Sequence, residues 1–184
     1  MTTFATLTGT GVPHPSPGRA GAGVCIRHEE IILQFDAGRG TVIRLSENKT
    51  PLHQISAVFL THVHSDHVID LADVVMTRWI QQTLRAAQPL EIVCPKGTPE
   101  AFVIRMLDPF EIDIALRVDH VQKSPPKYSI NAFTPNSVKQ HVWASPDNRV
   151  RVSAVAVHHE PVPDAVAYRV DTPDGAIVIS GDTR

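Results

Sequence analysis

The stretch Thr61-His62-Val63-His64-Ser65-Asp66-His67 places four metal-binding side chains within six residues. An apolar run, 55–60, comes just before it. If a strand delivers the stretch, His62 and His64 point to the same side, because strand side chains alternate. The serine then permits a turn, and the acid and the third histidine can reach a second point. This spacing predicts two adjacent cations held by imidazole and carboxylate ligands, which suit zinc or a similar first-row ion.

A polar loop with surface histidines is the alternative interpretation of this stretch. A lone histidine would favour it, but three histidines and an aspartate straight after a buried strand do not. Five of the ten histidines fall in two tight groups, the second being the pair at 158 and 159. We therefore expect a ligand from the second group, with His158 and His159 both open as candidates.

Further acidic and histidine side chains also follow predicted strands. Strands at 150–157 and 176–179 precede His159 and Asp182, and Asp36 directly ends another apolar strand. Layered folds commonly build sites where strands end. Asp182 could bridge two ions with one oxygen to each. Asp36 could orient a metal-binding histidine from behind, with an Asx turn or a helix N-cap as its alternative role.

The remaining elements are predicted from periodicity and from chain breakers. The region 8–23 is rich in glycine and proline and predicts a loop, and 110–148 indicates short strands and loops. Alternation and apolar runs predict strands at 4–7, 24–27, 31–35, 55–60, 91–94, 150–157, 165–170 and 176–179. Helical periodicity predicts helices at 41–48, 68–87 and 99–107, the last one capped by Thr98.

Composition limits the class of protein. The 184 residues, 42% of them hydrophobic, suffice for one domain with its own core. A net charge of −2 gives nucleic-acid binding no support from bulk charge, although a local basic patch stays compatible with it. Cys25 and Cys94 lie far apart and are expected as buried apolar residues. No leader-like start and no membrane-length apolar run is present, so we expect a cytoplasmic protein without a membrane partner.

The predicted ligand set favours metal-assisted hydrolysis. A water held between two divalent ions loses a proton near neutral pH and becomes a nucleophile, while the ions polarise the bond being cut. No serine or cysteine nucleophile is then needed. The sequence contains nothing like a nucleophile elbow, which disfavours acyl-enzyme chemistry.

The run 62–67 resembles the HxHxDH motif of the metallo-β-lactamase superfamily. His159 and Ser180-Gly181-Asp182-Thr183 are similar to its third and fourth motifs, and Asp36-Ala37-Gly38 to its first. The resemblance covers essentially the whole chain, in order. The opening Gly9-Thr10-Gly11, together with the closing Ser-Gly-Asp-Thr, is most similar to the ribonuclease Z and arylsulfatase-like branch.

The resemblance implies an α/β fold, a four-layer αββα sandwich with the metals at one edge. Residues 1–184 would form a single such domain, incomplete at its C-terminus. By the resemblance, an intact site holds two Zn²⁺ ions, with Mn²⁺ or Fe as alternatives. The implied ligands are His62, His64 and His159 for the first zinc, Asp66 and His67 for the second, and Asp182 as the bridge.

The resemblance also assigns finer roles. Asp66 would act as the general base in addition to its ligand role, and Asp36 would support a ligand from behind. His159 is preferred over His158 because His159-Glu160-Pro161-Val162-Pro163 resembles the corresponding segment of ribonuclease Z-like members.

The sequence departs from the family pattern in two places. Family members carry a further histidine ligand after the fourth motif, whereas this chain stops two residues after Asp182. We therefore expect the second metal to be held weakly and apolar strand faces to be exposed. Ribonuclease Z proper also carries a long tRNA-gripping arm between the third and fourth motifs, but only 23 positions separate His159 from Asp182.

Three functions follow as hypotheses. The first is a zinc-dependent phosphodiesterase of the ribonuclease Z type, which uses a metal-bound hydroxide on an RNA phosphodiester. The second is a small-molecule hydrolase of the arylsulfatase or lactonase kind, which the short inter-motif segment favours. The third is a non-catalytic metal-binding domain, which the missing histidine favours. A homodimer is kept as a partner alternative.

Overall fold

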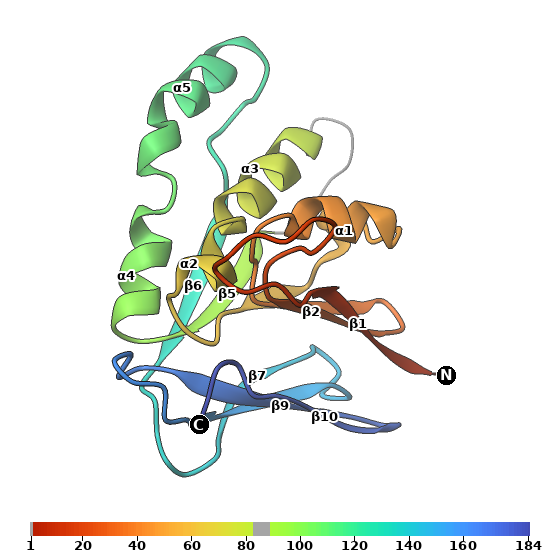
Figure 1. Ribbon diagram of the computed structural model, residues 1–184. Coiled ribbons are helices and arrows are strands. Elements are labelled where there is room, and N and C mark those ends of the chain that lie inside the picture. The colour runs from red at the N-terminus through yellow and green to blue at the C-terminus, as the bar shows by residue number, and fades with distance from the viewer. Residues whose placement is uncertain (1, 83–88) are drawn as a thin grey trace.

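The structure, a computed structural model, describes residues 2–82 and 89–184. Two β-sheets face each other, and helices cover the outer side of the larger sheet (Figure 1). Among the described residues, no helix lies over the outer face of the smaller sheet. The order helix, sheet, sheet supplies three of the four layers expected of an αββα sandwich.

The larger sheet has six strands and carries the centre of the fold. Its strands are β1 (Thr3–Gly9), β2 (Gly23–His28), β3 (Ile31–Phe35), β4 (Ala57–Phe59), β5 (Leu90–Pro95) and β6 (Tyr128–Phe133). They lie in chain order, antiparallel from β1 to β3 and parallel from β3 to β6. The register pairs Phe35 with Phe59. The segments that follow β3 and β4 therefore leave the sheet at the same edge.

The smaller sheet has four antiparallel strands. They are β7 (Gln140–Ala144), β8 (Arg151–Ala156), β9 (Val166–Thr172) and β10 (Gly175–Ile179). Their order is β10-β9-β8-β7, so β10 is an edge strand. The predicted turn at 172–175 joins β9 to β10 as a hairpin.

Five α-helices and two short 3₁₀ helices complete the described part of the chain. They are α1 (Thr41–Glu47), η1 (Leu52–Gln54), α2 (Ser65–Val68), α3 (Leu71–Gln81), α4 (Thr98–Arg105), η2 (Asp108–Phe110) and α5 (Glu111–His120). None of the described helices has both the length and the apolar character needed to cross a bilayer.

Two apolar cores lie on opposite faces of the larger sheet. Neighbouring residues in its strands alternate between them: Ile32 packs under the helices, and Leu33 packs against the smaller sheet. Phe35, Phe59 and Tyr168 form the aromatic centre of the inter-sheet core, with the two phenylalanine rings stacked at 4.6 Å. Burial on both faces explains why β3 and β4 are almost continuously apolar.

The region 110–148 was expected to contain only short strands and loops, and this expectation was wrong for its first part. Helix α5 spans Glu111–His120, and none of its residues is buried. Its apolar residues Ile112, Ile114 and Leu116 alternate with other side chains, which imitates the period of a strand. Its half-buried residues, which include Ile114 and Val118, recur at helical spacing, but the strand-like alternation of the apolar residues hides this spacing in the sequence.

Two predicted helices differ in detail. The helix expected at 68–87 is divided, because α2 ends at Val68 and the backbone N–H of Asp70 donates to the carbonyl of Ala37. Of its predicted span, residues 83–87 lie outside the described part. Thr98 is not the N-cap of α4, since Gly97 holds that position; instead its backbone N–H and hydroxyl bind the Asp164 carboxylate.

The strand expected at 55–60 is shorter in the structure. Separately, the edge strands of the two sheets carry exposed apolar side chains. Strand β4 includes only Ala57–Phe59; the 3₁₀ helix η1 ends at Gln54, and Ile55 and Ser56 connect the two elements. Phe4 and Leu7 on β1 and Val178 on β10 are exposed, as expected of open strand faces. The assignment of residues 1–184 to one incomplete domain stays a prediction.

Candidate metal centre

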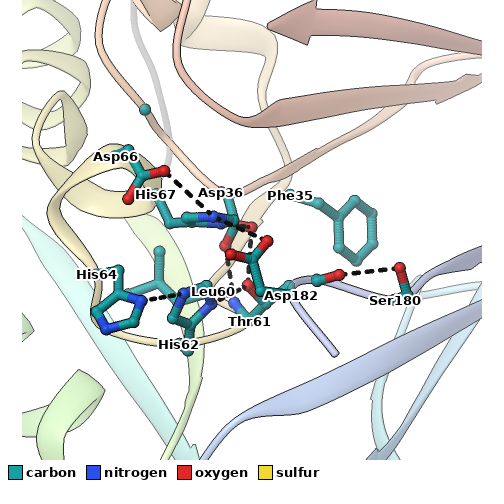
Figure 2. Close-up of polar contacts among 12 residues, drawn as sticks. Phe35, Asp36, Leu60, Thr61, His62, His64, Asp66, His67, Ser180 and Asp182 are labelled. Carbon is teal, nitrogen blue, oxygen red and sulfur yellow. Dashed lines mark hydrogen bonds and ion pairs between the residues drawn. The ribbon is translucent and has the colours of Figure 1, made fainter. Parts of the chain in front are cut away.

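Four chain segments meet at one edge of the two facing sheets. Asp36 follows β3, the run 60–67 follows β4 and enters α2, His159 lies beyond β8, and Asp182 lies beyond β10. Figure 2 shows the side chains from the first two segments and the carboxylate of Asp182 turned toward one another. The expected pattern of strand followed by ligand therefore places these residues together.

Three imidazole rings converge on the first candidate position. His64 Nδ1 lies 3.1 Å from His62 Nε2 and 3.1 Å from His159 Nε2. Together with Asp182, these residues offer ligand atoms within 4.8 Å of one another. Two nitrogens bound tetrahedrally to one zinc at about 2.0 Å stand roughly 3.3 Å apart. The nitrogen spacing therefore fits a single divalent ion.

Burial keeps His62 neutral. Its side chain is completely buried, and this burial, together with the nearby His67, His159 and His64, lowers its pKa to about 3. Neutral imidazole is the form that binds a metal, because a protonated ring has no free lone pair. The ring is therefore ready to accept a cation at neutral pH.

A second group of donors lies beside the first. His67 Nε2 is 3.4 Å from Asp182 Oδ1 and 3.9 Å from Asp66 Oδ2. The His62 and His67 rings are 4.1 Å apart between centroids, so the two groups are adjacent. Asp182 therefore lies near both groups, 3.4 Å from His67 and within 4.8 Å of the three-histidine ligand atoms, as expected of a bridging carboxylate. Its side chain is 51% exposed, unlike those of Asp66 and His67, which are buried.

Asp36 contacts the ligand segments from behind. Its Oδ2 lies 2.7 Å from His67 Nδ1, and it accepts the backbone N–H and the hydroxyl of Thr61, each at 2.8 Å. Burial alone would lower the pKa of His67, but the hydrogen bond and charge of Asp36, assisted by Asp182 and Asp66, raise it. The alternative role as a helix N-cap is wrong, because Gly40 precedes α1.

The neighbouring histidine His158 lies outside the cluster. Its side chain is 62% exposed, and its Nε2 lies 3.7 Å from a carboxylate oxygen of Glu160. His159 is the member of the pair whose ring reaches His62 and His64. Geometry therefore favours His159 as the third ligand.

Close backbone packing supports the segment that carries Asp66 and His67. A Cβ atom on Gly38 would lie 2.1 Å from the Asp66 carbonyl oxygen, so only glycine fits there. The N–H of Gly38 donates to Ala22 in the predicted glycine-rich loop. That loop thus packs behind the ligand segment, a contact that joins residues far apart in the sequence.

A cavity of about 510 Å³ reaches the second group of donors. It lies between β1 and β10 and is lined near the centre by Asp36, His67 and Asp182. Its outer part is apolar and includes Leu7 and Ile177. The carboxylate side of the centre is therefore open, whereas His62 is enclosed.

Sequence reasoning gave no role to Thr61. The residue is fully buried, and its hydroxyl lies between Asp36 and His62 Nδ1, 3.0 Å from the latter. The sequence offered one indication of such a role: a polar residue stands between a predicted buried strand and a predicted ligand. Its partner Asp36, however, lies 25 positions away, so the contact could not be derived locally.

Known proteins of the same fold share this arrangement of elements. A ribonuclease Z from Mycolicibacterium gilvum is 36% identical over 180 residues, which are 97% of this chain and 60% of that protein. The short form of human tRNase Z superposes with a TM-score of 0.76 at 22% identity, covering 98% of this chain and 69% of that one. YhfI of Bacillus subtilis, a metallo-beta-lactamase fold protein, gives a TM-score of 0.74 at 19% identity, covering 98% and 63%.

The chain spans about 60% of the length of the curated relatives it matches. The family described as the beta-lactamase superfamily domain matches residues 33–184, which include every predicted ligand. These matches confirm the expected family and its α/β fold. The chain belongs to the metallo-β-lactamase superfamily.

Proposed function

We propose that this chain carries the metal-binding residues of a zinc-dependent phosphodiesterase of the ribonuclease Z type. The proposal is supported by the three nitrogens that meet at 3.1 Å beside a second group of donors. It is also supported by the curated relatives, which are ribonucleases Z. RNA is the substrate class those names suggest. Mn²⁺ or Fe remain alternatives to Zn²⁺ under this proposal.

Each donor has a proposed role. His62, His64 and His159 would hold the first ion, and Asp66 and His67 would hold the second. Asp182 would bridge the two, because it approaches both groups. When bound, the ions supply two effects: they acidify a water molecule and polarise a phosphoryl oxygen.

The chain's own residues account for orientation and proton transfer. Asp36 fixes His67 through Nδ1, which leaves Nε2 directed at Asp66 and Asp182. Asp66, proposed as the general base, is buried and has one carboxylate oxygen 3.9 Å from the His67 ring nitrogen. A carboxylate at that place can hold a proton taken from the attacking group and return it to the leaving group.

The test uses the intact protein supplied with zinc or manganese. Substrates are a pre-tRNA with a 3′ extension, bis-p-nitrophenyl phosphate, p-nitrophenyl sulfate and a lactone. We expect phosphodiester cleavage that a chelator abolishes and that His62→Ala removes. The exposed neighbour variant His158→Ala is the matched control and should cleave normally. Activity that survives His62→Ala would show that the proposed roles are wrong.

A second candidate is a small-molecule hydrolase on the same fold. The 23 positions between His159 and Asp182 include the β9–β10 hairpin, which leaves no length for a long RNA-gripping arm. The net charge of −2 is also low for a protein that grips RNA phosphates with lysine and arginine. Cleavage of p-nitrophenyl sulfate or the lactone, with pre-tRNA left intact, would favour this candidate.

A further inference from the structure

Thr61 lies between two histidines of the proposed metal centre without being a ligand itself. Its backbone N–H donates to Asp36 Oδ1 and its hydroxyl donates to Asp36 Oδ2, both at 2.8 Å. The same hydroxyl oxygen is 3.0 Å from His62 Nδ1. Figure 2 shows the threonine between Asp36 and the His62 ring.

A proton count decides the direction of each hydrogen bond. A threonine hydroxyl has one proton, and an ionised carboxylate can only accept. Asp36 faces three hydrogen-bond donors, and its two carboxylate oxygens accept from all of them. The Thr61 hydroxyl therefore donates to Asp36, and its oxygen must accept a hydrogen bond from a protonated His62 Nδ1. This leaves His62 Nε2 unprotonated, facing His64 Nδ1 at 3.1 Å.

The same carboxylate fixes the second histidine directly. His67 Nδ1 donates to Asp36 Oδ2 at 2.7 Å, so the neutral form of His67 also carries its proton on Nδ1. Its Nε2 then faces Asp182 and Asp66 with a free lone pair. Asp36 thus fixes two imidazole rings: His62 through the Thr61 hydroxyl, and His67 by a direct hydrogen bond.

We propose that Thr61 is a positioning residue whose hydroxyl holds His62 in the Nδ1–H tautomer, so that Nε2 is presented to the metal. The inference rests on the metal site of the proposed function. Thr61 also fixes its surroundings: its carbonyl accepts the N–H of Val166 on β9, and a Cβ on Gly181 would lie 2.8 Å from the Thr61 Cβ. Thr61 therefore contacts the segments that carry Asp36 and Asp182, and also strand β9.

The experiment compares Thr61→Val with Thr61→Ser in the intact protein. Valine keeps the shape and removes the hydroxyl, whereas serine keeps the hydroxyl. Thr50→Val is the matched control. Thr50 is a buried threonine whose hydroxyl accepts a hydrogen bond from Arg27 and, within the described residues, contacts no histidine. The first readout is the affinity for Zn²⁺, measured in competition with a chelator. The second is the ¹⁵N spectrum of the histidine rings in metal-free protein, which reports each tautomer.

We expect Thr61→Val to bind the first zinc about 10- to 100-fold more weakly, the usual effect of losing a partner behind a ligand. Its His62 signal should move toward the Nε2–H form. Thr61→Ser and Thr50→Val should keep both the wild-type affinity and the Nδ1–H signal. Loss of affinity without a change of tautomer would indicate a packing role and overturn the proposal.

The wild-type spectrum alone gives a second decisive outcome. If His62 carries its proton on Nε2 in the unsubstituted protein, the proposal is wrong, whether or not Thr61→Val folds. Neither readout uses hydrolysis. A protein with normal zinc affinity and the Nδ1–H signal but no activity on any substrate would therefore refute the proposed function and leave the role of Thr61 standing.

Discussion

The two sides of the metal centre differ in how closely their donors are held. On the histidine side, the ring nitrogens of His62, His64 and His159 meet at 3.1 Å, and His62 is fully enclosed. On the carboxylate side, the corresponding distances are 3.4 and 3.9 Å, and Asp182 is half-exposed. The first side is preorganised by the loop between β4 and α2. The second depends on a residue that follows an edge strand.

This difference indicates an order of metal binding. Donors already held at ligand spacing lose little conformational freedom when an ion arrives, whereas an exposed carboxylate must still be ordered. We therefore expect the histidine side to bind first and more tightly. The expectation of a weakly held second ion, made from the sequence, remains a prediction that this geometry supports.

The largest expected effect comes from His62→Ala. It removes the most buried of the three nitrogens and should weaken binding of the first ion by more than the roughly 100-fold that loss of a supporting hydrogen bond costs. Calorimetric titration of the metal-free protein with Zn²⁺ measures it. Unchanged binding of the first ion would contradict the claim that the histidine side binds metal more tightly than the carboxylate side.

Asp36→Asn should have an intermediate effect on both sides. The amide removes the negative charge that faces His67 and the acceptor that receives the Thr61 hydroxyl. We expect both zinc affinities to fall by about 10- to 100-fold, with the pKa of His67 lowered toward or below its ordinary value. Zinc titration and ring NMR follow the two changes. An effect on one side alone would show that Asp36 does not couple them.

The pH dependence of unfolding should separate the two sides in the metal-free protein. The pKa of His62 falls from 6.5 to about 3, so its contribution to stability is full above pH 6.5 and is lost as the pH falls toward 3. The pKa of His67 is raised above 6.5, so its contribution is full below pH 6.5 and is lost as the pH rises through the raised value.

Urea unfolding across pH values on both sides of 6.5 measures these opposite trends. His62→Asn should remove part of the loss of unfolding free energy in acid. His67→Asn should remove part of the loss above pH 6.5. If both variants change the profile in the same direction, the environments assigned to the two rings are wrong.

The smallest expected effect comes from His158→Ala. The side chain is exposed and contacts only Glu160 among the ion pairs of the described residues, so zinc affinity should stay within about twofold of wild type. The same titration measures it. A loss as large as that of His159→Ala would place His158 in the centre and reverse the choice between the two histidines.

The strand-end donors were predicted from local signals, and the structure places their side chains close together, while their roles as ligands stay a prediction. His62, His64 and His67 stand in one motif, and Asp36 and Asp182 each follow an apolar strand. What failed depended on distant contacts. Helix α5 has no fully buried residue, and its apolar residues alternate as they would in a strand. The acid that binds the start of α4 is 66 positions away from it. The role proposed for Thr61 depends on its contact with Asp36, which only the folded structure shows.

The most direct test of the account is the position of bound zinc. Anomalous diffraction at the zinc edge from crystals of the intact protein should show a strong peak about 2.0 to 2.1 Å from His62 Nε2, His64 Nδ1 and His159 Nε2. A weaker peak should lie between His67, Asp66 and Asp182. A zinc ion bound without His62, or a stronger peak on the carboxylate side, would contradict the account.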